Sequence, residues 1–234
     1  MKTSLLLRST GLLTAVLLAT TAMRAQPLFF TPPPNEAMFE FVGQVKNAPP
    51  AGPGLPATST QYGYLSHIQG LSDDQIFLPG APKNETSALF TFYNDSVNDK
   101  VTDHGSLRIV IREGTTTIYY NPAAGGDLTT PNPDSFRQGT PVLTSKWRHQ
   151  VILDTNAGSD PAAPPRTNLF FVTWWHTITS AEFVNLGDKQ VLLGFPGTRF
   201  EQHLVGGVDL TGKVNGKFAG YAESLVPVIV RSRH

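Results

Sequence analysis

The feature that most constrains the fold is a succession of short runs rich in β-branched and aromatic residues, separated by turn residues. These residue types are enriched in strands, and no long run has apolar residues at helical spacing without an interrupting Gly or Pro. A parallel α/β sheet needs crossover helices, and the sequence leaves no place for them. The expected strands are 61–69, 87–93, 106–112, 115–120, 142–154, 168–180, 190–193, 199–210, 217–224 and 225–230.

Two turn signals favour antiparallel connections between these strands. Glu113-Gly114 lies between two alternating runs, and Asn215-Gly216 is a pair that favours a two-residue type I′ turn. One short helix or irregular turn is expected near residues 71–77. The pattern predicts an all-β fold, a single antiparallel β-barrel of about eight or more strands, with a β-sandwich as the alternative.

The segment before this body is rich in proline. Pro32-Pro33-Pro34 and Pro49-Pro50 remove backbone donors and restrict φ, so their surroundings are expected to be extended. Between them, residues 39–45 alternate in the way that is typical of a strand. We therefore expect a Pro-rich N-terminal arm over residues 26–57 with one candidate strand, followed by the barrel domain over residues 58–234.

Residues 1–25 have the layout of a secretory signal peptide. A basic start is followed by an apolar stretch over residues 11–19 and then by small residues. The apolar stretch is too short for a membrane span, which needs roughly 17 to 25 apolar residues. The sequence therefore predicts a secreted or periplasmic protein without a membrane span, cleaved after Ala22 or Ala25.

Charge and cysteine content exclude several classes of function. The chain has 18 Lys and Arg against 18 Asp and Glu, and loss of the basic signal peptide would leave a slightly acidic product. Such a chain lacks the basic surface that holds nucleic acid, so no nucleic-acid partner is predicted. The absence of cysteine excludes disulfides, thiolate nucleophiles and Cys-ligated metal sites.

Histidines on apolar strand faces are the main candidates for a site. The period of two in a strand puts His176 on the same face as Trp174, and it puts His149 on another apolar face. One interpretation is that each imidazole is a core residue hydrogen-bonded to a neighbour. The other is that His149, His176 and His203 meet across the sheet and line a cavity, with Tyr119 as a further wall residue.

A second candidate group comprises Arg199, Glu201 and His203, which share one side of a predicted strand. A carboxylate two residues from an imidazole on a β face can contact it and fix its tautomer. The group lies either on a solvent-exposed face or in the barrel interior, where unpaired charges would be costly. The neighbouring Phe200 and Leu204 indicate that the apolar residues occupy the other face.

No metal or cofactor site is predicted. The sequence lacks a His-x-His pair and the recognised double-histidine spacings, so a His-metal enzyme is a minor alternative. It also lacks the Gly-x-Ser-x-Gly elbow, the phosphate loop and the dinucleotide fingerprint. These absences leave open whether the protein is an enzyme.

Two short segments resemble a known superfamily. Gly216, Phe218 and Gly220 form a Gly-x-Phe-x-Gly step that resembles the Gly-rich strand pair of the allene oxide cyclase and dirigent barrels. Residues 87–95 resemble the strand-then-turn segment of the same group. The resemblance implies an eight-stranded antiparallel barrel with an apolar cavity, whose members guide cyclisation or coupling of reactive hydrophobic intermediates. It places no catalytic residue on this chain.

The export signal, the all-β pattern and the missing catalytic motifs together favour a binding protein. We expect a secreted, non-catalytic β-barrel that binds a small hydrophobic ligand or a macromolecular partner, with a homo-oligomer as one form of partner. The alternative is an allene oxide cyclase-like or dirigent-like protein that steers cyclisation or isomerisation of a hydrophobic intermediate in the barrel cavity.

Overall fold

The computed structural model describes residues 28–30, 37–129, 132–155, 167–209, 215–224 and 228–232. The predicted signal peptide, residues 1–25, lies outside these ranges. The helices in the described ranges are short, and none of them is long and apolar enough to cross a membrane.

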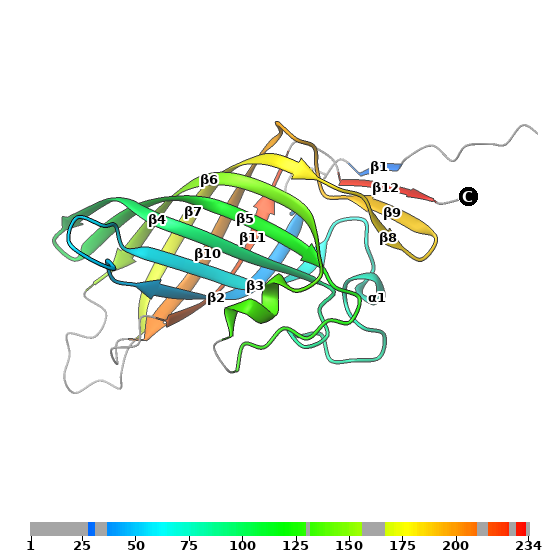
Figure 1. The fold of residues 1–234 in the computed structure, drawn as a ribbon, viewed down its shortest axis with the longest axis horizontal. Helices are drawn as coiled ribbons and strands as arrows, with labels where there is room; N and C mark the ends of the chain where they lie inside the picture. The colour runs from blue at the N-terminus through cyan, green and yellow to red at the C-terminus, as the bar shows by residue number, and fades with distance from the viewer. Residues whose placement is uncertain are drawn as a thin grey trace, which may run out of the picture.

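Eight antiparallel strands close into a barrel (Figure 1). Closure occurs because β2 pairs with β11 and β10 pairs with β7, so every strand of this sheet has two neighbours. A closed sheet has no exposed edge strand, and the predicted barrel is confirmed over the alternative sandwich. The barrel strands are β2 (Phe39–Ala48), β3 (Thr58–Ile68), β4 (Phe90–His104), β5 (Leu107–Tyr120), β6 (Thr140–Asp154), β7 (Thr167–Ala181), β10 (Arg199–Asp209) and β11 (Asn215–Glu223).

The first barrel strand comes from the segment expected to form the Pro-rich arm. β2 contains the alternating residues 39–45 and pairs along its length with both β3 and β11. The barrel therefore begins at Phe39 and not at residue 58. Without β2 the sheet would not close, so this part of the arm belongs to the barrel.

A second, four-stranded sheet lies beside one end of the barrel (Figure 1). Its strand order is β1-β12-β9-β8, and it joins the two ends of the described chain, because β1 pairs with β12. The strands are β1 (Leu28–Phe30), β8 (Val184–Leu186), β9 (Lys189–Leu192) and β12 (Val228–Ser232).

Both expected hairpin turns are wrong. Gly114 lies inside β5, where it pairs with Ser96 of β4 and Trp147 of β6. A Cβ atom at this position would lie 2.6 Å from Trp147 Cζ2, so glycine is needed for close approach and not for a turn. Gly216 pairs with Val208 as an ordinary residue of β11. The turn between β4 and β5 lies instead at Gly105, whose φ is 63°.

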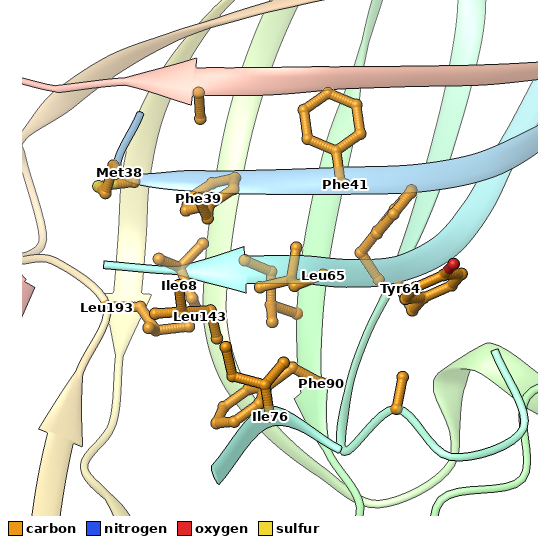
Figure 2. Close-up of a cluster of buried hydrophobic side chains, with 14 of the residues drawn as sticks. Met38, Phe39, Phe41, Tyr64, Leu65, Ile68, Ile76, Phe90, Leu143 and Leu193 are labelled. Atoms are coloured by element: carbon orange, nitrogen blue, oxygen red, sulfur yellow. The ribbon is translucent and has the colours of Figure 1, made fainter. Parts of the chain in front are cut away.

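The packed end of the barrel, defined here as the end nearest α1, is filled by large apolar side chains (Figure 2). α1 (Asp73–Ile76) confirms the predicted short helix, and Ser72 N donates to Gln75 Oε1 (3.1 Å) at its start. The helix buries Ile76 completely against the barrel. Side chains from the barrel strands and from the segment after β9 complete this end, namely Met38, Phe39, Leu65, Ile68, Phe90, Leu143 and Leu193.

The long loop between β5 and β6 covers the outside of the barrel. Its 3₁₀ helix η1 (Pro133–Arg137) buries Phe136 against Tyr62 of β3, with ring centroids 5.3 Å apart. Thr91 Oγ1 of β4 donates to the Phe136 carbonyl oxygen (2.8 Å). The loop therefore shields the part of the outer face around Tyr62 of β3 and Thr91 of β4 from water.

Candidate ligand-binding site

A layer of polar side chains crosses the inside of the barrel. Gln61, Asn94, Thr116 and Ser145 stand opposite one another on the adjacent strands β3, β4, β5 and β6. All four are buried. This polar layer separates the packed end from the remaining interior.

An aromatic stack continues this layer on β6 and β7. His149 and His176 each lie 1% exposed on the inner face, as period-two geometry predicts. The register pairs Trp147 with His176 and His149 with Trp174. Trp147 stacks on Trp174 with ring centroids 5.3 Å apart, and His149 stacks on Trp147 at 4.7 Å. The two predicted histidines therefore share one aromatic cluster.

His176 is held by a neighbouring hydroxyl. Its Nδ1 lies 2.9 Å from Ser145 Oγ, within hydrogen-bond distance. Burial lowers the pKa of His176 from 6.5 to about 3, and the adjacent Gln202 side chain opposes that shift only in part. The imidazole is therefore neutral near pH 7. This fits the interpretation of His176 as a core histidine bonded to a neighbour.

His149 has a different environment. Neither of its ring nitrogens has a hydrogen-bond partner among the described residues. Burial, followed by the charge of Arg112 and the proximity of His176, holds the pKa of His149 well below 6.5. His149 therefore contributes a neutral imidazole, with one nitrogen able to donate and the other able to accept.

The cavity end of the barrel, defined as the end opposite α1, contains a cavity of about 70 Å³. Its wall includes several valines, where the packed end has Phe, Leu and Ile, and the smaller side chains leave space between the strands. Three members of the polar and aromatic layers, Gln61, His149 and Trp174, reach this wall. The lining residues are Val45, Asn47, Gln61, Val110, Arg112, His149, Val151, Leu153, Phe170, Val172, Trp174, Leu204, Val208 and Phe218.

One charged residue, Arg112, lines this cavity. Its Nε donates to Asn98 Oδ1 (2.7 Å) and its Nη2 donates to Asn47 Oδ1 (2.9 Å). No carboxylate of the described residues forms an ion pair with it. Burial lowers the pKa of Arg112 from 12.5 to about 10, so the guanidinium remains charged at pH 7.

No family model, curated protein or solved structure matches this chain. The geometry of the barrel is therefore the basis for judging each candidate residue.

The remaining candidates from the sequence lie away from the cavity. His203 and Glu201 are on the outer face of β10, with His203 Nε2 and Glu201 Oε2 3.8 Å apart and both side chains partly exposed. Arg199 shares that face, whereas Phe200 points inward. The solvent-face interpretation is therefore the one that the structure supports, and His203 does not join His149 and His176.

Tyr119 also lies outside the cavity wall. The inner face of β5 at this level is formed by Ile118, which is buried, and by Tyr120, whose ring packs against Phe90 at 5.2 Å. The register shift between Ile118 and Tyr119 arises from an extra residue, Val142, on β6, and the alternation along β5 continues through Tyr120. Strict alternation along β5 therefore puts Tyr119 on the opposite face from Ile118 and Tyr120.

Sequence reasoning missed Arg112 because it divided β5 at Gly114. Once Gly114 is taken as a strand residue, alternation puts Arg112 on the inner face with Val110, Thr116 and Ile118. The sequence signal that could have identified Arg112 is a charged residue at the same alternating positions as apolar residues of one strand. Within the described residues, no group of three or more His, Asp or Glu side chains gathers at a distance suited to a metal ion.

Proposed function

We propose that this protein is a secreted, non-catalytic β-barrel that binds a small hydrophobic ligand in the cavity at its cavity end. The observation that carries the proposal is the cavity itself, whose wall is largely apolar and comes from most of the barrel strands. Ligand sites are typically apolar cavities with a few polar groups that orient the ligand. Export is supported by the signal-peptide pattern of residues 1–25.

The size of the cavity limits its occupant. A volume of 70 Å³ is small beside drug-sized pockets of roughly 300–1,000 Å³. It suits a molecule of few heavy atoms, or one end of a longer molecule that extends through the mouth of the barrel.

The nearest arrangement to a catalytic pair favours binding over catalysis. Ser145 and His176 are within hydrogen-bond distance, but both are buried, Ser145 in the polar layer and His176 in the aromatic stack, and neither lines the cavity. A general base works best with a pKa near the operating pH, and burial lowers the pKa of His176 to about 3. This pair is better explained as part of the barrel interior.

The proposal is tested by titrating the protein with 1-hexanol while following tryptophan fluorescence and thermal unfolding. We expect saturable binding and a raised midpoint of unfolding, because a ligand that binds only the folded state stabilises it. Val151→Phe fills the cavity and should abolish both effects. Val101→Phe is the matched control, because Val101 is 48% exposed on the barrel surface. Unchanged hexanol binding in Val151→Phe, or no binding in the wild type, contradicts the proposal.

A steering function in the same cavity is the alternative. The closed eight-stranded barrel is the architecture that the resemblance at Gly216, Phe218 and Gly220 implies. Such a protein would change the product distribution of a reactive hydrophobic epoxide that otherwise cyclises without guidance. Identical product ratios with and without the protein, and with Val151→Phe, argue against this alternative.

A second candidate is self-association through the outer face of β7 and β10. Leu169, Phe171 and Val205 are 51%, 55% and 48% exposed, and the register places Phe171 directly opposite Val205. Exposed apolar patches on sheets commonly mark protein contacts. Sedimentation of the wild type and of Phe171→Ser tests this, since a dimer held by this face should dissociate in the variant. A monomeric wild type rejects it.

A further inference from the structure

Two neighbouring arginines of the barrel have very different surroundings. Arg148 of β6 points outward and contacts two carboxylates, with Nη1 2.6 Å from Glu113 Oε1 and Nη2 2.8 Å from Asp99 Oδ2. Arg112 of β5 points inward, next to His149, and its side-chain partners among the described residues are the amide oxygens of Asn47 and Asn98. The more exposed arginine therefore has two counter-ions, and the half-buried one has none among the described residues.

Among the described residues, this arrangement leaves a half-buried positive charge in the barrel wall without a counter-ion. A charge removed from water is costly unless it is paired, and the two asparagines neutralise none of it. A guanidinium has five N–H donors, and the two asparagine oxygens occupy two of them. Arg112 can therefore still bind a planar anion through its remaining donors.

Other polar groups in the same wall also lack partners. Trp174 and His149 are 2% and 1% exposed, and Trp174 Nε1 and both His149 ring nitrogens have no hydrogen bond within the described chain. The indole Nε1 is only a donor, and a neutral imidazole supplies one more donor. Buried donors without partners are rare in folded proteins. These nitrogens are themselves buried, so Arg112 is the polar group of the wall that is best placed to meet an anion.

We infer that the ligand of the cavity is an amphipathic organic anion, whose carboxylate pairs with Arg112 while its apolar part contacts Val151, Val172 and Leu204. This inference rests on the proposed function and specifies its ligand class. The carboxylate supplies the counter-ion that the barrel interior lacks. The apolar remainder fills the part of the wall that is unsuited to an inorganic anion.

The decisive measurement is calorimetric titration of the full chain with sodium hexanoate and, separately, with 1-hexanol. The two probes share a hydrocarbon chain and differ in the charged group. A charge-assisted hydrogen bond to a shielded arginine should make hexanoate bind about tenfold or more tightly than hexanol. Equal affinities, or tighter binding of hexanol, overturn the anion assignment while leaving the hydrophobic-ligand proposal intact. Failure of both probes to bind rejects the proposed function itself.

Variants locate the preference. Arg112→Met keeps much of the side-chain volume and removes the charge, so it should lose the hexanoate preference and still bind hexanol. Arg112→Lys keeps a charge and should retain part of the preference. Arg148→Met is the matched control and should leave both affinities unchanged, because that side chain is on the outer surface. An unchanged hexanoate preference in Arg112→Met excludes Arg112 as the anion partner. The wild-type comparison remains decisive if Arg112→Met does not fold.

Discussion

The two ends of the barrel interior are built from the same alternating strands, yet one is filled and the other is hollow. At the packed end, Leu65, Ile76 and Phe90 fill the space between the strands, with Ile76 supplied by α1 from outside the barrel. At the cavity end, Val110 and Val151 leave a cavity of about 70 Å³ between them and their neighbours. Valines at the cavity end and the short helix added at the packed end therefore account for a difference that strand geometry alone does not explain.

The largest expected effect comes from a matched pair of leucine truncations. Leu65→Ala should destabilise the protein toward the upper end of the range of about 2–5 kcal/mol, because the packed end cannot collapse around a new void. Leu204→Ala should fall toward the lower end of that range, because Leu204 already borders a cavity and has fewer packing contacts to lose. Urea denaturation measures both changes. Equal losses would show that the two ends are packed equally well.

Acid should lower the free energy of unfolding through the two buried histidines between the ends, His149 and His176. The pKa of unfolded histidine is about 6.5 and the pKa of His176 is lowered to about 3, so between these values the unfolded chain binds the extra proton. The contribution of His176 to stability is therefore fully present well above pH 6.5, and it is lost progressively as the pH falls toward 3. At pH 5 the loss is about 2 kcal/mol for His176, with a loss of the same sign for His149.

Urea denaturation at pH 7.5 and pH 5 tests this dependence. His176→Gln should lose less stability between the two pH values than the wild type does. His203→Gln is the control, because that histidine lies on the outer face, and its pH dependence should match the wild type. A wild-type profile that is retained in His176→Gln would disprove the role of His176.

A smaller effect is expected where a strand glycine lies beneath the aromatic stack. Gly114→Ala places a methyl group against the backbone carbonyl oxygen of Asp95 and 2.6 Å from Trp147 Cζ2, and the resulting displacement should cost about 1–3 kcal/mol. Gly52→Ala is the control, because its nearest atom, Leu55 Cδ1, is 3.8 Å away. Near-ultraviolet circular dichroism should change in the first variant alone. An unperturbed signal in Gly114→Ala would mean that the added methyl group does not displace the stack.

The smallest effect is expected outside the barrel. Glu201→Gln removes an exposed partner of His203, and the free energy of unfolding should change by less than about 0.5 kcal/mol. Ligand binding should also be unchanged, because the pair lies on the far side of the wall from the cavity. Weakened hexanol or hexanoate binding in this variant would place the site on the outer face.

The sequence predicts the barrel and the inner faces of β6 and β7 because these strands alternate regularly over residues 145–151 and 170–178. In β7, Trp174 and His176 follow directly from the period of two, and their burial confirms it. The same reasoning fails in β5, since a glycine that admits a tryptophan ring is locally indistinguishable from a glycine that makes a turn. Because of that error, Arg112 was not predicted to lie on the inner face.

Contacts between side chains of different strands also could not be predicted from the sequence. The pairing of Ser145 with His176 depends on which strands are neighbours and on their register, and neither follows from one strand alone. Likewise, one strand alone does not reveal that Arg112 has no carboxylate beside it among the described residues, because that depends on the position of every neighbouring strand. Local alternation predicts which residues face inward, and closure of the sheet decides what they meet there.

The stacked indoles also give the molecule its own spectroscopic signal. Trp147 and Trp174 lie 5.3 Å apart with their planes inclined by 15°, close enough for their electronic transitions to couple. The third tryptophan, Trp175, is 42% exposed and faces outward. Inner and outer indoles should therefore differ in emission wavelength and in quenching by acrylamide. Because Trp174 borders the cavity, a bound ligand should change the tryptophan fluorescence of the protein, so binding can be followed without an attached dye.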